Sequence, residues 1–268
     1  MKPFAVMSAL VACTLAATFV AADGAEGDAW GYMSNDTHMA SPEQWVEHYP
    51  TCGGSRQSPI DIEVSSGCSS ETRSLTFSGK CTDYYLTQYE ETFKAAINGG
   101  SCAVSANGAT YNMAQFHLHA PSEHLLNGEH LDGEVHFVHS NSDGSALLVT
   151  GVFFKAVDGA ETDPWVASVL DALDTVNMNE TVSMSINSYA DLINTAADAH
   201  GVFNYAGSLT TPACSEIVDW WVVKEPVKLS PADLERLQSQ LKEIPITDDG
   251  KNARPVQPLN GRVITAYV

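Results

Sequence analysis

The sequence predicts a single domain that is mainly β, with a large, mostly antiparallel central sheet and helices at its periphery. Short apolar runs separated by Gly, Ser, Asn and Asp follow one another from Ile60 to about Val152. Only two later segments have helical spacing, so alternating βαβ units fit less well. No internal repeat, low-complexity tract or linker divides the chain, and single β-rich domains reach this length.

The first 22 residues have the pattern of a cleaved secretory signal peptide. Lys2 gives a positive start, an apolar stretch runs from Phe4 to Val20, and Val20-Ala21-Ala22 resembles a cleavage site. The alternative, a membrane anchor, is disfavoured because the apolar core is short and rich in Ala and no basic cluster follows it. We therefore expect a signal peptide over 1–22 and one domain over 23–268 without a later membrane span. The destination would be the extracellular space, a periplasm or an organelle lumen.

Within the domain, residues 23–50 show little periodicity and are expected to form an irregular N-terminal wrap. Strands are expected at four apolar runs, residues 75–77, 84–86, 95–97 and 146–149. A helix is predicted to open at Asp163-Pro164, because Pro suits the first helical turn and apolar residues recur at helical spacing up to Leu173. A second helix is predicted to open at Ser230-Pro231, with Ser230 as the N-cap.

The chain is strongly acidic, with 13 basic and 33 acidic residues and a formal net charge of −20. Nucleic acids and anionic membranes bind through basic patches, so neither is expected as a partner. The charge suits a protein that stays dispersed in solution, and it carries no information about catalysis.

Five cysteines follow the predicted signal peptide, and secretion permits them to form disulfides. They are Cys52, Cys68, Cys81, Cys102 and Cys214. The odd number leaves at least one free thiol or an intermolecular bond. Asn35-Asp36-Thr37 and Asn179-Glu180-Thr181 are glycosylation sequons, which matter only if the host secretes through a glycosylating route.

The strongest chemical signal is a set of histidines on two strand-like segments. In a strand, residues two apart point to the same side, so His117 and His119 share a face with Gln115. A second alternating segment carries Glu134 and His136 on one face. Three imidazoles with an open fourth position form the arrangement of catalytic zinc sites. Gln115 and Glu134 each precede a histidine by two residues, where they can orient its second ring nitrogen.

Together with other motifs, these residues resemble the alpha-class carbonic anhydrases of the secreted type, over nearly the whole domain from Trp30 to Asn260. The matching segments are Arg56-Gln57-Ser58-Pro59-Ile60-Asp61-Ile62, Gln115 to His119, Ser122-Glu123-His124, Glu134 to His139, Gly207-Ser208-Leu209-Thr210-Thr211-Pro212, Asn252-Ala253-Arg254-Pro255 and Gln257-Pro258-Leu259. The resemblance implies the fold of that family, a large twisted sheet in one domain. It also implies reversible hydration of CO2 to bicarbonate and a proton by a hydroxide held on Zn²⁺.

The resemblance assigns roles to individual residues. His117, His119 and His136 are the expected zinc ligands, and Gln115, Glu134 and Asn252 are expected to support them. Thr210 is expected to accept the proton of the hydroxide and to donate its own hydroxyl hydrogen to Glu123, which fixes the direction of attack. Thr211 is expected beside bicarbonate. The apolar wall for CO2 would comprise Val138, Val149, Leu209, Val218 and Trp220, although plain core packing would explain any one of these residues equally well.

Other matches are structural. Cys52 and Cys214 match the disulfide of secreted family members, and Cys68 with Cys81 is a candidate for a second bridge, although sequence does not settle connectivity. His124 and His139 match interior positions. His38, His48, His130 and His200 are expected at the surface.

One departure concerns proton transfer. Fast family members carry a histidine in an Asn-Gly-His segment, and Asn98-Gly99-Gly100 places Gly100 at that position. Because Gly100 carries no titratable group, we expect slower, more buffer-dependent hydration. His38 is a candidate substitute. The competing functions are a non-catalytic carbonic anhydrase-like binding or matrix protein, which the complete set of three histidines disfavours, and another zinc hydrolase, for which no further general base is evident.

Overall fold

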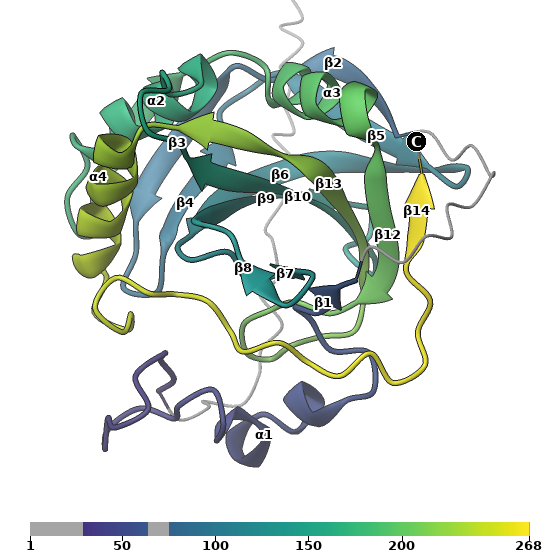
Figure 1. Ribbon diagram of the computed structural model, residues 1–268, viewed down its shortest axis with the longest axis vertical. Helices are drawn as coiled ribbons and strands as arrows, with labels where there is room; N and C mark the ends of the chain where they lie inside the picture. The colour runs from purple at the N-terminus through teal and green to yellow at the C-terminus, as the bar shows by residue number, and fades with distance from the viewer. Residues whose placement is uncertain (1–28, 64–74, 268) are drawn as a thin grey trace, which may run out of the picture.

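The computed structural model describes residues 29–63 and 75–267, and within helix α3 it describes the side chains up to residue 197. A twisted sheet of eleven strands forms the body of the protein (Figure 1). Its strands are β2 (Thr76–Lys80), β3 (Asp83–Gln88), β4 (Phe93–Ile97), β5 (Ser101–Ala106), β6 (Ala109–His119), β9 (Gly133–Ser140), β10 (Leu147–Ala156), β11 (Thr181–Ser185), β12 (Val202–Gly207), β13 (Val218–Leu229) and β14 (Thr265–Tyr267). The four expected strand segments fall within or beside β2, β3, β4 and β10.

The sheet is mostly antiparallel, as predicted. Its main path runs β11-β3-β4-β6-β9-β10-β13-β12-β14, and β5 pairs with β6 and β2 beside that path. The single parallel pair among these described strands is β10 with β13. A smaller sheet joins β1 (Asp61–Ile62), β7 (Leu125–Leu126) and β8 (Glu129–His130).

Both predicted helices are present, each begins at the predicted residues, and Ser230 caps the second as expected. In α2 (Pro164–Leu173) the Asp163 side chain accepts a hydrogen bond from the backbone N–H of Trp165. In α4 (Pro231–Lys242) the Ser230 side chain accepts one from the N–H of Asp233. These helices lie along the upper and left margin of the sheet in Figure 1 and contact each other.

The expectation of only two helical segments was wrong, because α3 (Tyr189–His200) packs against β13. Its buried residues Tyr189, Leu192, Ile193 and Ala196 do follow helical spacing. Small alanines make that stripe weak in the sequence, and burial against the sheet stabilises it.

The N-terminal wrap also contains regular turns, α1 (Trp45–His48) and the 3₁₀ turn η1 (Pro50–Gly53), which lie at the bottom of Figure 1. Trp45 is fully buried there, and its indole N–H donates to the Ala40 carbonyl. Edge-on ring contacts with Trp30 and Tyr32 complete this cluster. The wrap is therefore fixed by aromatic packing, which a search for periodicity does not detect.

Register across the sheet brings distant residues onto one face. His117 on β6 pairs with His136 on β9, and His119 pairs with Glu134. His136 in turn pairs with Gly151 on β10, and Val149 of that strand pairs with Trp220 on β13. Paired residues point to the same side of a sheet. One face of four neighbouring strands therefore presents imidazoles at its centre and apolar side chains beside them.

Two disulfides are present among the described residues. The expected bond between Cys52 and Cys214 links η1 to the loop before β13 across 162 residues of sequence. The candidate bond between Cys68 and Cys81 is wrong, because Cys81 bonds to Cys102. Strand β2 pairs with β5 so that Gly79 faces Cys102, and this brings Cys81 within reach. Cys68 lies outside the described residues.

Candidate active site

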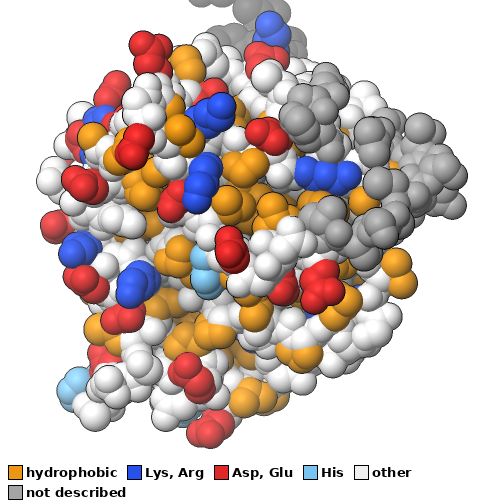
Figure 2. Space-filling view, viewed as in Figure 1, with side chains coloured by type: hydrophobic (Ala, Val, Ile, Leu, Met, Phe, Trp, Pro, Cys, Tyr) orange, Lys and Arg blue, Asp and Glu red, His pale blue; other side chains and the backbone are white. Residues whose placement is uncertain are grey.

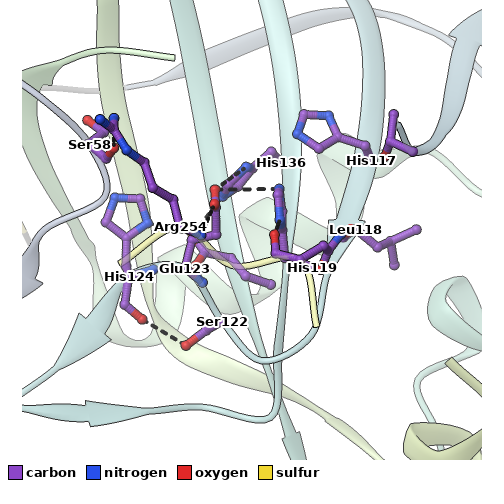
Figure 3. A network of polar contacts seen from close by, with 12 residues as sticks. Ser58, His117, Leu118, His119, Ser122, Glu123, His124, His136 and Arg254 are labelled. Atoms are coloured by element: carbon purple, nitrogen blue, oxygen red, sulfur yellow. Dashed lines mark hydrogen bonds and ion pairs between the residues drawn. The ribbon is translucent and has the colours of Figure 1, made fainter. Parts of the chain in front are cut away.

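Three imidazoles converge at the centre of the sheet face (Figure 3). The ring centroids of His117 and His119 are 5.1 Å apart, and those of His136 lie 5.3 Å and 4.6 Å from them. One ring nitrogen from each residue lies within 4.8 Å of the other two. His119 and His136 are buried, and His117 is partly buried. The strand alternation seen in the sequence thus yields a compact cluster once β6 and β9 pair.

Each imidazole donates one ring N–H to a fixed acceptor. His117 Nδ1 donates to Gln115 Oε1 at 3.0 Å, and His136 Nε2 donates to Glu134 Oε1 at 2.9 Å. His119 Nδ1 donates to the backbone carbonyl of Asn252 at 2.8 Å. These bonds leave Nε2 of His117, Nε2 of His119 and Nδ1 of His136 as lone-pair nitrogens facing the cluster.

Asn252 is also fixed to the strand that carries the histidines. Its side-chain amide donates to the Leu118 carbonyl and accepts from the N–H of Ala120, both at 2.9 Å. The C-terminal segment around Asn252 is therefore hydrogen-bonded to the end of β6. This docking orients the His119 ring through the Asn252 carbonyl.

Glu134 is fully buried and accepts four hydrogen bonds. Its Oε1 accepts from the rings of His136 and His124, and its Oε2 accepts from the backbone N–H groups of Glu123 and His124. Burial alone would raise the pKa of this carboxyl, but the two imidazoles hold its pKa well below the usual range. The group is therefore a carboxylate that fixes the orientation of His136.

The histidine cluster fits a metal ion that prefers nitrogen ligands. Burial, reinforced by the neighbouring imidazoles, lowers the pKa of His117 well below its usual value, and burial also lowers the pKa of His119. Neutral imidazoles have the free lone pair that a metal requires. Buried His119 Nε2 has no hydrogen-bond partner among the described residues. The alternative set His124, Glu134 and His136 fits less well, because hydrogen bonds already join its three side chains.

Thr210 and Glu123 flank the cluster, but the hydrogen bond expected between them is absent. Thr210 is buried in the loop between β12 and β13. Glu123 Oε1 accepts from the backbone N–H of Arg254 at 2.9 Å. Its Oε2 has no hydrogen-bond partner in the described part of the chain and lies 3.5 Å from His119 Nε2. That oxygen faces the imidazoles and also lies 3.8 Å from His136 Nδ1.

A cavity of about 480 Å³ opens above the three histidines. Val138, Val149, Leu209 and Trp220 line one side of it, as expected for an apolar wall, and Thr210 and Thr211 also line it. Val218 was expected there too, but it is buried beside Val149 and Trp220 and does not line the cavity. Its register opposite Leu147 places it one pair further from the histidines than Trp220.

The assignment of Gly100 to a proton-transfer position was wrong. Gly100 lies in the turn between β4 and β5, where an added Cβ would face the Lys80 carbonyl, and it does not line the cavity. The rim is formed by the turn between β3 and β4 instead, through Tyr89, Glu91 and Thr92. His38 does not line the cavity either. The segment Asn98-Gly99-Gly100 resembled the family motif in composition only.

A polar network that was not predicted from the sequence holds the site together. Arg254 is buried and donates through its guanidinium to Gln57 Oε1 and to the carbonyls of Ser58 and Cys52. Tyr205 Oη lies 2.6 Å from His124 Nε2 and 2.9 Å from Ser58 Oγ. Gln57, Ser58 and Arg254 lie in segments that had been matched, but which side chains meet depends on three distant segments.

The remaining histidines lie as expected where they are described. His124 and His139 are fully buried, whereas His38, His48 and His130 are exposed. The side chain of His200 lies outside the described set. No helix in the described ranges is both long and apolar enough to cross a membrane.

Comparison with known proteins gives a consistent result. Residues 40–268 match the family described as eukaryotic-type carbonic anhydrase. A carbonic anhydrase from Klebsiella pneumoniae is 32% identical, over 88% of this chain and 89% of its own. The alpha-carbonic anhydrase structure from Photobacterium profundum is 33% identical, with a TM-score of 0.72 over 88% of this chain and 99% of its own. The Thermovibrio ammonificans enzyme, described in complex with the inhibitor sulfanilamide, is 32% identical with a TM-score of 0.74 over 89% of this chain and 99% of its own.

The match covers the residues that line the cavity from Tyr89 to Asn252, and it leaves out Trp30 and Tyr32 of the N-terminal wrap. The chain therefore belongs to the eukaryotic-type, or alpha, carbonic anhydrase family of enzymes.

Proposed function

We propose that this protein catalyses the reversible hydration of CO2 to bicarbonate and a proton, with Zn²⁺ as its cofactor. One observation carries the proposal. Three imidazoles, each oriented by a separate acceptor, converge at the base of a cavity that has an apolar wall on one side. A neutral, apolar substrate and a water molecule would both be accommodated there.

His117, His119 and His136 would hold the zinc ion. Three nitrogen ligands and one open position fit catalytic zinc, and the buried lone pair of His119 Nε2 lacks any other partner among the described residues. When bound, zinc makes a coordinated water acidic enough to react near neutral pH, an effect for which carbonic anhydrase is the standard example. Glu134 and Gln115 would maintain the ligands in the ring form that leaves the correct nitrogen free.

The apolar wall of Val138, Val149, Leu209 and Trp220 would hold CO2 close to the nucleophile and exclude competing water. Thr210 would orient the nucleophile. Because Glu123 Oε2 has no other partner among the described residues, it is available to accept the Thr210 hydroxyl hydrogen. Thr210 could then only accept a hydrogen bond from the attacking oxygen, which directs a lone pair at the carbon. Thr211 would contact the bicarbonate product.

Two disulfides support an oxidising destination. We propose secretion, or delivery to a periplasm or organelle lumen, by the signal peptide at 1–22, with 23–268 as the mature domain. Those first residues lie outside the described part. N-terminal sequencing of the exported protein tests the cleavage point, and a start other than Asp23 would move it.

The decisive experiment is stopped-flow CO2 hydration with the purified mature protein, before and after zinc removal by a chelator and after zinc is restored. We expect activity to follow zinc occupancy with one ion per chain. Thr210→Val should lower kcat/KM by about 100-fold through loss of orientation, whereas Thr181→Val, an exposed change on β11, should not. A folded, zinc-loaded protein without hydration activity would favour the non-catalytic binding or matrix protein.

A further inference from the structure

Lys94 occupies an unusual place in the cavity. Strand β4 pairs with β6 so that Ala95 faces Phe116 and Ala96 faces Gln115. Continuing this antiparallel register by one residue places Lys94 opposite His117. Paired side chains project from the same face with Cβ atoms about 5 Å apart. The Lys94 side chain therefore lies beside the His117 imidazole and lines the same cavity.

The surroundings of Lys94 leave its charge available to the cavity. Its side chain is half-buried, and its Nζ lies 5.2 Å from the centre of the Tyr89 ring. No carboxylate of the described residues lies within ion-pair distance of Nζ. Within the described part of the chain, the only acidic side chain that lines the cavity is Glu91, which is exposed at the rim.

The charge of Lys94 is exceptional in this protein. The chain carries a formal charge of −20, and acidic side chains are spread over the face shown in Figure 2. A field of that sign opposes the approach of small anions. Among the described residues that line the cavity, Lys94 is the single lysine or arginine. A positive charge next to His117 would offset the opposing field at the one place where an anionic product or substrate must sit.

We propose that Lys94 is a specificity-determining residue that draws small monovalent anions, bicarbonate among them, into the cavity and strengthens their binding beside His117. The inference rests on the proposed function for the identity of bicarbonate, but not for the anion site itself. The competing role is structural, with Lys94 serving only to pack on Tyr89.

The test uses thiocyanate as the probe and the purified protein with Co²⁺ in place of zinc. Anion binding changes the visible absorption of Co²⁺, so a titration gives a dissociation constant that does not depend on activity. The variants are Lys94→Met, Lys94→Glu and Lys94→Arg. Lys80→Met serves as a matched control, because it removes an exposed charge outside the cavity. Circular dichroism and the anion-free cobalt spectrum establish that each variant is folded and loaded.

At 20 mM ionic strength we expect Lys94→Met to weaken thiocyanate binding about threefold and Lys94→Glu about tenfold. Lys94→Arg and Lys80→Met should stay within a factor of about 1.5 of the parent protein. At 0.5 M salt the differences should shrink towards one, because the Debye length falls well below the size of the cavity. The readout is equilibrium anion binding instead of a comparison of rates in the two directions. The equilibrium constant of the reaction fixes the ratio of kcat/KM for hydration to kcat/KM for dehydration, so no variant can change that ratio.

Unchanged affinity in Lys94→Met at low salt would overturn the proposal and leave Lys94 a packing residue. Loss of affinity in Lys94→Met that persists at 0.5 M salt would overturn it as well, because the effect would not be electrostatic. A Lys94-dependent affinity in a protein without CO2 hydration would refute the proposed function and support the anion site. Failure to take up Co²⁺ or Zn²⁺ would overturn both.

Discussion

Replacing Glu134 by Gln should weaken zinc binding, destabilise the protein, or do both. The carboxylate is fully buried and accepts four hydrogen bonds, at 2.7 Å and 2.9 Å on Oε1 and at 3.0 Å and 2.9 Å on Oε2. An amide retains one oxygen and substitutes a donor for the other. Whichever way the amide is turned, two of the four N–H groups meet an N–H₂ group instead of an acceptor.

The size of the effect of Glu134→Gln depends on which way the amide is turned. If the amide nitrogen faces the imidazoles, His136 Nε2 must become an acceptor and its proton moves to Nδ1, the atom left for the metal. Zinc affinity should then fall by about 10- to 100-fold, or about 1.4–2.7 kcal/mol. If it faces the backbone instead, two buried N–H groups lose their partner at about 1–3 kcal/mol each.

Zinc dissociation constants from competition with a chelator, and urea unfolding of the metal-free protein, distinguish the two cases. Glu129→Gln on β8 is the control, because that side chain is exposed. A Glu134→Gln protein with zinc affinity within about twofold, and unfolding free energy within about 0.5 kcal/mol of the parent, would refute this account of the network.

Three further outcomes are expected. Gly151→Ala should lower zinc affinity about tenfold and the free energy of unfolding by about 1–3 kcal/mol, because an added Cβ would lie 2.7 Å from Glu134 Oε1. Chelator competition measures the zinc affinity and urea unfolding measures the stability. Unchanged values would show that β10 shifts to make room for the methyl group without disturbing Glu134. Glu91→His should raise the rate of CO2 hydration in dilute buffer, because a group that titrates near neutral pH would lie at the cavity rim. Gly100→His should not raise it. A gain from Gly100→His alone would restore the assignment of Gly100 to the proton-transfer position. His139 has its pKa lowered by burial from 6.5 to about 4, so the unfolded chain binds a proton between those values that the folded protein does not. Its contribution to stability should be complete above pH 6.5 and decrease as the pH falls towards 4, by about 2 kcal/mol between pH 7 and pH 5. Urea unfolding of the zinc-loaded parent should show this loss relative to His139→Gln, and parallel pH profiles would contradict it.

Local patterns in the sequence predicted much of the fold and of the site. The alternation of Gln115, His117 and His119 required only that the segment be a strand, because the side-chain period of a strand is two. The starts of α2 and α4 could be predicted from Asp163-Pro164 and Ser230-Pro231, because Pro suits the first helical turn and an N-cap acts on the next two or three residues. Such features depend on neighbours in the chain, so the sequence contains them.

Tertiary structure decided the features that join distant segments. Only the register of β6 with β9 brings His136 level with His117, and only the docked C-terminal segment supplies the Asn252 carbonyl to His119. The partner of Cys81 was likewise set by the pairing of β2 with β5.

The cavity rim shows the same division. From composition, the Gly-rich turn at Gly100 looked like a family motif, but the turn that reaches the cavity carries Tyr89 and Glu91. A motif of two or three residues specifies a turn, and many turns share it. Which turn faces the histidine cluster follows from strand order and register across the whole sheet, and these are set by packing between residues far apart in the chain.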